Sequence, residues 1–527
     1  MRVSWDKTID RFRGKRALAA LLLLTVLSFL VRFLFLLSKP HPFGFDGYYY
    51  VTQLTRFVIS GHLHSPESSW VVWLMVPLRF VLGDSILAVK LAGAGLAALC
   101  VPAAFWAVSA FGSDRAEGYS KDGFHIASWM AAVWAAGSPV LSLMAAEFPK
   151  NLGMITTGLC FWALWWSKPN GKLHWLGLGI FAVLTLTAHR LGILLLLIAI
   201  SGTLFERWMQ PGSPQTQKPR AWLLPSVLAG IVVLFGCLSY LLPNLLHPSD
   251  LERLKGALDT RPAWLPFAYF GLWSPSWALR IEIGAGWPLL FIMGSAFVRI
   301  KKMRPWLIVF AAAFLLCNFP FWNSHRLDLG YRLGLLGPLS TLFPVILLLW
   351  FRHSKAPARR RPVAVAGVAF CCLGWLFLSP IGIQTARMPP YGRYRAMLAR
   401  IPKPYPQKVI AHSGMNFYYG HLTRHPAVAW APLPSENRKE IFRIAWGIRD
   451  GEWLAFLAHY DVDPAPLRLD PDYTYIREDV WEAFVKWAEK SGDEDILERI
   501  YSSKNPHRTK PDYLQRNWKS DPNKTDL

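Results

Sequence analysis

The stretch ALAALLLLTVLSFLVRFLFLL, Ala17–Leu37, decides the fold, and the motif HPFGFDGYYY, His41–Tyr50, follows it. Ala17–Leu37 reaches the roughly 20 residues with which a helix crosses the hydrocarbon core of a bilayer. Similar apolar blocks recur along the chain of 527 residues, of which 53% are hydrophobic and only 17% are charged. The sequence therefore predicts an all-α polytopic membrane bundle.

Basic residues divide the loops between these blocks into two kinds. The basic residues before the first apolar block include Lys7, Arg11, Arg13, Lys15 and Arg16. The loop RHSKAPARRRP, 352–362, is the most basic, and alternate loops before it are basic too. Because Lys and Arg stay on the cytoplasmic side, we expect a cytoplasmic N-terminus, about eleven transmembrane helices and an extracytoplasmic C-terminus. The loops also account for the net charge of +23, so we expect no nucleic-acid partner.

Several local predictions apply within this bundle. Early spans are expected at 17–37, 85–111 and 125–143, and a membrane hairpin at 176–187 and 191–204. The segment Trp70–Gly83 contains Pro77 and Arg79 and is short for a span, so we expect a helix that lies in the outer interface. Arg32 has two interpretations: its side chain snorkels to the interface, or it binds an anionic lipid headgroup.

Composition divides the chain into three parts. Residues 1–380 form the membrane domain, 381–502 a small extracytoplasmic α/β domain, and 503–527 a polar tail that we expect to be disordered. In the α/β domain we expect a strand at 408–412 and, at 414–420, a turn into a helix. Asp479, with Glu482 three residues later, is predicted to cap an amphipathic helix that ends near Gly492. The six cysteines lack metal-ligand spacing.

Polar residues gather at the span ends that this topology places outside. They are Asp46, Tyr48, Tyr49, Glu147, Lys150, Asn151, His189, Arg190, His325, Arg326 and Arg332. Ionisable residues at bundle ends tend to face cavities rather than lipid. A carboxylate such as Asp46 can take a proton from a hydroxyl acceptor, and Arg190, Arg326 or Arg332 can bind phosphate oxygens. Asp46 and Glu147 could also hold Mg or Mn with waters, although nothing in the sequence requires a metal.

Each of these residues also has a purely structural interpretation. A lone Asp between glycines, as at Asp46, commonly forms a turn or a helix cap. Tyr48–Tyr50 could be an interfacial aromatic belt. Glu147 could be a solvated loop acid, while His189–Arg190 and Arg332 could simply end spans. The sequence leaves these alternatives open.

The chain resembles the GT-C superfamily of integral-membrane glycosyltransferases, which includes protein O-mannosyltransferases and aminoarabinose transferases. The resemblance covers about 1–350 and rests on Phe45-Asp46-Gly47-Tyr48-Tyr49-Tyr50 in the first outer loop, Gly83-Asp84-Ser85, the acidic loop around Glu147, and Thr187-Ala188-His189-Arg190. Many members have a second acid beside the first-loop Asp, and here that position is Gly47. The α/β domain resembles the extracytoplasmic domain of many members in position only.

The resemblance implies inverting transfer of a hexose or pentose from a polyprenyl-phosphate-linked donor. The acceptor would be a glycan, a lipid or a protein at the extracytoplasmic face of a membrane, here the bacterial inner membrane. It implies that Asp46 is the catalytic acid-base residue and Glu147 the second acid. Two other functions stay open: a secondary transporter, and a membrane assembly protein that acts through its C-terminal domain. Transporters place polar residues and broken helices near the midplane, whereas here the polar residues are expected at one face.

Overall fold

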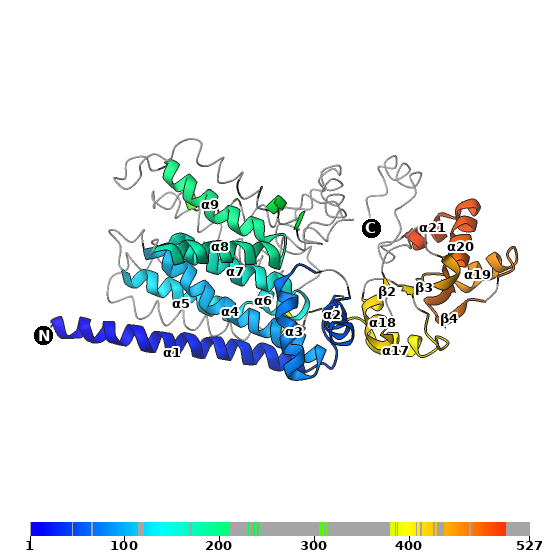
Figure 1. The fold of residues 1–527 in the computed structure, drawn as a ribbon, viewed down its shortest axis with the longest axis horizontal. Helices are drawn as coiled ribbons and strands as arrows, with labels where there is room; N and C mark the ends of the chain where they lie inside the picture. Colours follow the sequence, from blue (N-terminus) through cyan, green and yellow to red (C-terminus); the bar gives the residue numbers. More distant parts are fainter. Residues whose placement is uncertain are drawn as a thin grey trace. The chain divides into compact units, whose positions relative to one another are not determined.

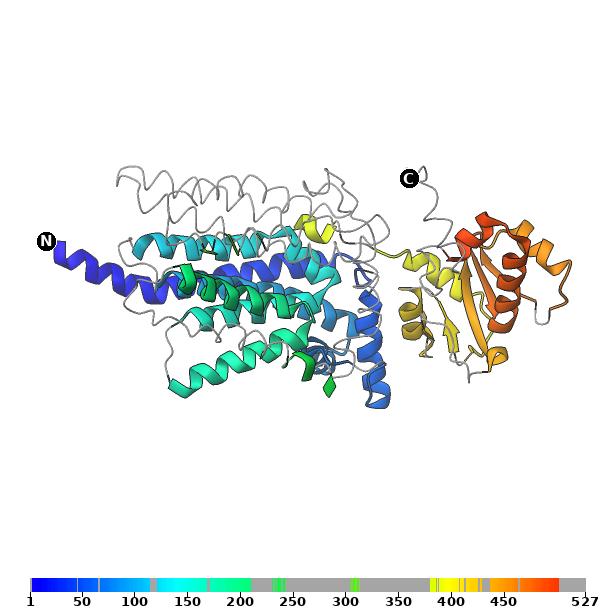
Figure 2. The same cartoon turned by 90° about the horizontal axis from the view of Figure 1, so that it is seen from above.

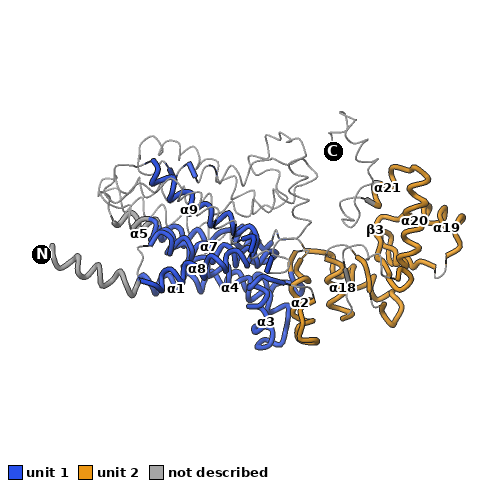
Figure 3. The backbone as a smooth tube through the Cα atoms, turned by 45° about the horizontal axis from the view of Figure 1, so that its top comes forward, with its two compact units in different colours: residues 1–42, 65–387 blue, residues 43–64, 388–527 orange. Residues whose placement is uncertain are grey.

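The structure is a computed structural model, and most of the residues that it describes lie within 2–209 and 380–501. The described residues are 2–44, 46–64, 67–113, 121–167, 171–209, 380–384, 386, 388–406, 408–411, 414–424, 427–428, 437–462 and 465–501, with a few positions between 230 and 312. Two compact units result (Figure 3): Met1–Pro42 with Ser65–Arg387, and Phe43–His64 with Met388–Leu527. We call them the membrane unit and the C-terminal unit. The sequence did not predict that 43–64, which include Asp46, belong to the second.

The membrane unit is a bundle of helices. Its described helices are α1 (Arg2–Leu37), α3 (Trp70–Leu82), α4 (Ser85–Ser113), α5 (Lys121–Gly137), α6 (Pro139–Glu147), α7 (Pro149–Trp166), α8 (Gly171–Ala188) and α9 (Gly192–Met209). Figure 1 shows α1, α4, α7 and α8 running side by side, with the short α3 turned across their ends. Among the described residues, four helical segments are long and apolar enough to cross a membrane: Ala17–Leu37, Ser85–Phe111, Gly171–Ala188 and Gly192–Met209.

These segments confirm the predicted first and second spans and the predicted hairpin. The short helix expected at Trp70–Gly83 is α3, and its C-cap Gly83 has a φ of 71°, a conformation that favours glycine. The total of about eleven spans stays a prediction, because nearly all of the chain between 210 and 379 lies outside the described residues.

The third predicted span, 125–143, is a broken helix. Its two parts, Ser128–Gly137 and Pro139–Glu147, meet at an angle of 48°. Proline lacks a backbone N–H and clashes with the preceding turn, so Pro139 can begin a helix but cannot continue one. Ser138 caps the new helix, because its Oγ accepts a hydrogen bond from the Leu141 N–H at 3.1 Å. The prediction of one uninterrupted helix was therefore wrong.

Arg32 closes this break from within the bundle. Its side chain is fully buried, with 0% exposed. Nε donates to Ser142 Oγ at 2.9 Å, and Nη2 donates to the Ala135 carbonyl at 2.9 Å. A helix break frees carbonyls that lipid cannot satisfy, and a guanidinium has five donors for them. Both sequence-based interpretations of Arg32, snorkelling and headgroup binding, were wrong for this reason.

The C-terminal unit contains a five-stranded mixed sheet in the order β2-β1-β3-β5-β4. The strands are β1 (Lys408–Ile410), β2 (Ala427–Val428), β3 (Ile441–Trp446), β4 (Leu467–Asp470) and β5 (Tyr473–Arg477). The neighbours β2, β1 and β3 are parallel, whereas β3, β5 and β4 are antiparallel. The described helices are α2 (Gly47–Ser60), α17 (Tyr391–Leu398), α18 (Met415–Thr423), α19 (Asp450–Leu457), α20 (Glu478–Ser491) and α21 (Glu494–Tyr501), with a 3-10 turn at Arg438–Glu440. The described residues of this unit thus combine a sheet with helices, and their assignment to an extracytoplasmic α/β domain stays a prediction.

Helices cover both faces of the sheet, as Figure 2 shows for the yellow and red segments. On one face, Arg443 of β3 forms a doubly hydrogen-bonded ion pair with Glu478 of α20, and both side chains are almost fully buried. Trp481 and Phe484 of α20 fill the core beside this pair. On the other face, Arg393 of α17 lies over the ring of Tyr473.

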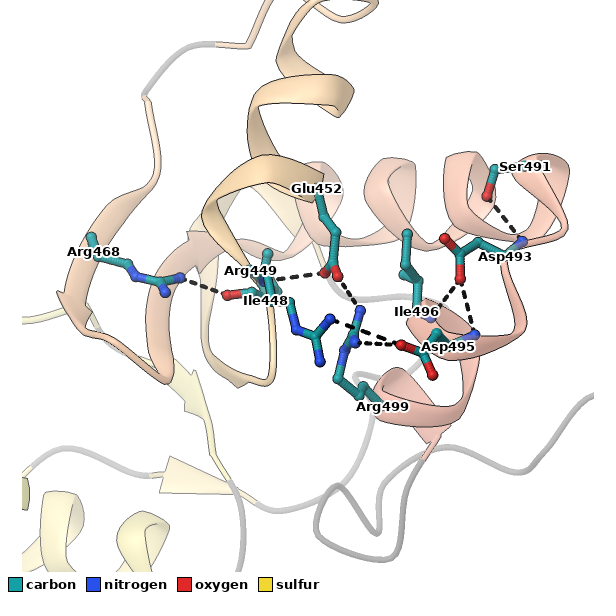
Figure 4. A network of polar contacts seen from close by, with 9 residues as sticks. All are labelled: Ile448, Arg449, Glu452, Arg468, Ser491, Asp493, Asp495, Ile496 and Arg499. Atoms are coloured by element: carbon teal, nitrogen blue, oxygen red, sulfur yellow. Dashed lines mark hydrogen bonds and ion pairs between the residues drawn. The ribbon is translucent and has the colours of Figure 1, made fainter.

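Polar side chains fix α21, the last helix that the structure describes (Figure 4). Asp493 Oδ1 accepts from the backbone N–H groups of Asp495 and Ile496, as an N-cap does. Glu452 joins α19 to α21, because it accepts from the Arg449 N–H and from the Arg499 guanidinium. Asp479 was predicted as such a cap for α20, but the N-cap of α20 is Arg477; the predicted end at Gly492 is confirmed.

Candidate functional site

The turn between α6 and α7 carries three of the predicted site residues. Glu147 is the last residue of α6, and Lys150 and Asn151 lie in the first turn of α7. Only Phe148 separates the two helices, so the expected loop is a tight break. Pro149 begins α7 in the position that proline favours. Glu147 and Asn151 are buried, with 3% and 5% of their surface exposed, so Glu147 is not a solvated loop acid.

The turn between α8 and α9 carries two more, His189 and Arg190. The Gly192 N–H donates to the His189 carbonyl at 2.8 Å, and the Leu191 N–H donates to His189 Nδ1 at 3.2 Å. A side chain at position 192 would overlap the Thr185 carbonyl, so this tight turn requires glycine. Both predicted residues are half-buried.

A segment that the sequence analysis did not single out joins these two turns. Glu67 pairs with Lys150, and Ser69 Oγ donates to the Ala188 carbonyl at 2.8 Å. Trp70 Nε1 donates to the Leu184 carbonyl at 2.9 Å. The start of α3 can approach α7 because a side chain at Gly153 would overlap Val71. We call Glu67, Ser69, Trp70, Lys150 and Ala188 the Glu67 junction.

The Glu67 junction holds the Lys150 ammonium at the end of the bundle. The Glu67 side chain is only 6% exposed, and its Oε1 also accepts from the Ser69 N–H at 2.9 Å. An ion pair with additional hydrogen bonds in a partly desolvated place holds its members in one geometry. Lys150 is therefore held within one short helical turn of Glu147 and Asn151. A fixed ammonium of this kind can bind an anionic group such as a phosphate.

Asp46 lies in the C-terminal unit, at the N-cap position of α2. Its side chain is exposed and makes no capping hydrogen bond. The turn is held by its backbone: the Gly47 N–H donates to the Gly44 carbonyl at 3.2 Å, and the Tyr49 N–H to the Asp46 carbonyl at 3.0 Å. Gly44 has a φ of 77°, which favours glycine. The first glycine of the motif therefore shapes a turn that presents Asp46.

Tyr48 and Tyr49 point into the C-terminal unit. The ring of Tyr48 is buried, with ring centroids 4.8 Å from Tyr391 and 4.9 Å from Tyr418, both at near-perpendicular angles. The ring of Tyr49 meets Phe417 at 5.2 Å. These contacts explain why aromatic residues follow Asp46, and the substrate-binding role of both tyrosines stays a prediction.

The Glu67 junction thus joins the two turns in or beside which five predicted residues lie: Glu147, Lys150, Asn151, His189 and Arg190. Asp46, Tyr48 and Tyr49 lie in the other unit, and His325, Arg326 and Arg332 lie outside the described residues. Glu67 was missed, although it is the only acid in the sequence between Asp46 and Asp84. Among the described residues, no group of three or more His, Cys, Asp or Glu side chains is placed to hold a metal.

Comparison with known proteins places this architecture in a fold class. No family model and no curated protein matches the sequence. Among solved structures, ArnT from Cupriavidus metallidurans bound to undecaprenyl phosphate has a TM-score of 0.53 at 13% identity, over 88% of this chain and 98% of that one. This chain therefore shares the fold of ArnT.

A second structure agrees. The oligosaccharyltransferase AglB from Archaeoglobus fulgidus, in complex with an inhibitory peptide and a dolichol-phosphate, has a TM-score of 0.51 at 11% identity. The match covers 79% of this chain but only 64% of AglB, so the chain spans less than two thirds of AglB.

Proposed function

We propose that this protein is a membrane glycosyltransferase that moves a sugar from a polyprenyl-phosphate donor to an acceptor at the extracytoplasmic face, with inversion. The observation that carries the proposal is the likeness to undecaprenyl-phosphate-bound ArnT over nearly the whole length of both chains. The junction supports it, because it fixes a lysine and a buried acid at one end of an apolar bundle.

The residues divide the chemistry between them. Asp46 takes the proton of the acceptor hydroxyl while the acceptor oxygen forms a bond to the anomeric carbon. The bond from that carbon to the phosphate oxygen breaks, and the phosphate leaves with the electron pair. Lys150 and Arg190 bind the phosphate oxygens and stabilise the developing charge. Glu147 is the second acid of the site and binds the acceptor.

A divalent cation would supply the same charge stabilisation as these basic residues. In the junction, the Glu67 carboxylate already pairs with the Lys150 ammonium, which makes it a poor metal ligand there. Every step above is carried by side chains of this chain.

The location follows from the charges of the loops. The basic N-terminus before α1 faces the cytoplasm, which places Asp46 and the C-terminal unit outside. The bacterial inner membrane, which holds undecaprenyl-phosphate carriers facing the periplasm, fits this orientation.

Transfer assays on membranes test the mechanism. Radiolabelled sugars on undecaprenyl phosphate, hexoses and pentoses in turn, are given to membranes that contain wild type, Asp46→Asn or Glu147→Gln. We expect Asp46→Asn to lose at least about 100-fold in transfer, as expected for removal of a general base. Asp461→Asn, an exposed acid of the same unit, is the control and keeps the wild-type rate. Full activity of both Asp46→Asn and Glu147→Gln would contradict the mechanism.

One observation bears on the transporter alternative. Broken helices mark many transporter sites, and α5 and α6 form such a break. Here the break is filled by the buried Arg32, which favours a structural role. Solute uptake into proteoliposomes without any sugar transfer would support transport instead.

A further inference from the structure

We infer that Tyr391 is a positioning residue that fixes the turn carrying Asp46. The inference rests on the proposed function, because it concerns how Asp46 is oriented for its reaction. Tyr391 stands 345 positions after Asp46 in the sequence, and the contacts of its side chain carry the argument.

Tyr391 touches the chain on both sides of Asp46. Its hydroxyl donates a hydrogen bond to the Gly44 carbonyl at 3.2 Å, two residues before Asp46. Its ring meets the ring of Tyr48, two residues after Asp46, with centroids 4.8 Å apart and planes at 73°. Edge-to-face pairs of this kind are favourable. One side chain therefore holds both ends of the turn that carries the exposed carboxylate.

Tyr391 is itself held firmly. It is the first residue of α17, and its side chain is 2% exposed. Its ring packs against Tyr418 at 5.3 Å and Tyr394 at 6.1 Å. Two residues on, Arg393 hydrogen-bonds to Asp470 of β4 at 2.6 Å. The anchor of the Asp46 turn is thus tied to the sheet.

The rest of α2 is attached to the same unit by other contacts. Thr52 Oγ1 donates to the Phe417 carbonyl at 2.9 Å, and Arg56 Nη1 donates to the Arg424 carbonyl at 3.1 Å. These bonds hold the body of the helix, one and two turns after Asp46. The Tyr391 hydrogen bond acts on the turn itself, where Gly44 and Gly47 give the backbone the most freedom.

The functional consequence is geometric. A catalytic base must be held at hydrogen-bond reach of the proton it takes, and small displacements of a reacting group cost much of the rate. Losing the hydroxyl of Tyr391 keeps the ring and the fold but frees the Gly44 carbonyl. The donor-binding residues in the membrane unit are unchanged by this substitution.

The experiment compares Tyr391→Phe with Tyr475→Phe in the full chain in lipid nanodiscs. Tyr475 lies in β5 with its ring stacked on Phe442, so its substitution removes a phenol hydroxyl from the same unit without touching 43–64. Hydrogen exchange of the peptide 43–50 reports the turn directly. Transfer from an undecaprenyl-phosphate-linked sugar reports its effect on kcat and on the KM of the donor.

We expect Tyr391→Phe to speed exchange in 43–50 and to lower kcat about 3- to 10-fold, the factor that corresponds to one hydrogen bond, at unchanged donor KM. Tyr475→Phe changes neither quantity. A second variant, Thr52→Val, removes a hydrogen bond from the body of α2 instead of from the Asp46 turn. We expect it to speed exchange later in α2 and not in 43–50, which separates a local effect of Tyr391→Phe from general loosening of the unit.

Two results separate this inference from the proposed function. If Asp46→Asn abolishes transfer while Tyr391→Phe keeps the wild-type kcat, the positioning role is wrong and the proposed function stands. A rise in donor KM with unchanged kcat, or unchanged exchange in 43–50, also overturns the positioning role. If Asp46→Asn transfers sugar at the wild-type rate, the role of Asp46 as the base in the proposed function is wrong, whatever Tyr391→Phe does.

Discussion

At the scale of single residues, one buried cation of this protein satisfies a broken helix and a second cation pairs with an acid at the end of the bundle. The sequence alone does not distinguish these two roles. Arg32 lies inside a predicted span, and Lys150 lies at the end of one. The structure gives Arg32 to the broken helix and Lys150 to Glu67. Arg32 and Lys150 differ in the residues that they bind. Those residues are 80 to 110 positions away in the sequence, so no local sequence pattern reveals them.

Substituting Arg32 tests its structural role. We expect Arg32→Met to lower the free energy of unfolding by about 3 kcal/mol, because it leaves the buried carbonyls and hydroxyls of the break without their donor. Thermal unfolding in detergent measures the change. Lys172→Met, at the exposed start of α8, is the matched control and is expected to have little effect. Equal losses for the two variants would contradict the role of Arg32.

At the scale of elements, the sequence predicts what periodicity and length encode. The spans at α1 and α4, the hairpin of α8 and α9, and the strand β1 follow from apolar runs bounded by turns. The break at Ser138 was missed because the apolar run continues on both sides of it, although Gly137-Ser138-Pro139 is a local signal for a helix to end and a new one to begin. The N-cap of α20 was misplaced at Asp479 instead of Arg477. The apolar face that follows is the same for a helix that begins after either residue, so it does not distinguish the two starts.

The candidate site was predictable in part for the same reason. Local motifs identify Asp46, Glu147 and the His189 turn, since each is a polar break between apolar runs. The sequence cannot show that Glu67 joins two of these turns, or that 43–64 pack with a domain more than 300 positions later, because both depend on tertiary contacts.

The tyrosines of the C-terminal unit predict its response to alkali. Burial raises the pKa of Tyr394 to about 12, and it also raises the pKa values of Tyr418, Tyr419, Tyr473 and Tyr475. Above about pH 10, the unfolded chain loses phenol protons that the folded chain keeps. The unfolded state then binds fewer protons, so the free energy of unfolding falls as the pH rises.

Replacing one of these tyrosines tests whether the free energy of unfolding falls with rising pH because buried phenols ionise. We expect Tyr394→Phe to recover about 2 kcal/mol of stability near pH 12, since the variant has no phenol to ionise. Phenolate absorbance and tryptophan fluorescence, followed together during an alkaline titration, measure ionisation and unfolding. Tyr240→Phe, at a side chain that is 91% exposed, serves as control. Unfolding that precedes any phenolate signal would refute the explanation.

At the scale of the whole molecule, the contacts of α2 predict whether the number of membrane crossings is even or odd. The segment 43–64 follows the first span, and it packs against α18 of the C-terminal unit. Two segments in contact outside the bilayer lie on the same side of it. We therefore predict that an even number of crossings separates them and that the total number of spans is odd, which is also what the basic loops predict.

Cysteine labelling in sealed membrane vesicles tests this parity. In a variant without native cysteines, Ser60→Cys and Ser491→Cys, both at exposed positions, are expected to react with an impermeant maleimide from the same side. Lys172→Cys, at the opposite end of α8 from the junction, is expected to react only from the other side. Labelling of Ser60→Cys and Ser491→Cys from different sides would contradict an odd number of spans.

The docking of α2 also sets an order of events during synthesis. Thr52 and its acceptor Phe417 are 365 positions apart, and at 5–20 residues per second the ribosome needs about 20–70 s to pass from one to the other. During that interval the apolar rings of Tyr48 and Tyr49 have no C-terminal unit to enter. The Asp46 turn is completed only after residues 391–418 have been made, so a nascent chain that ends before them inserts into the membrane without its contacts to Tyr391 and Tyr418.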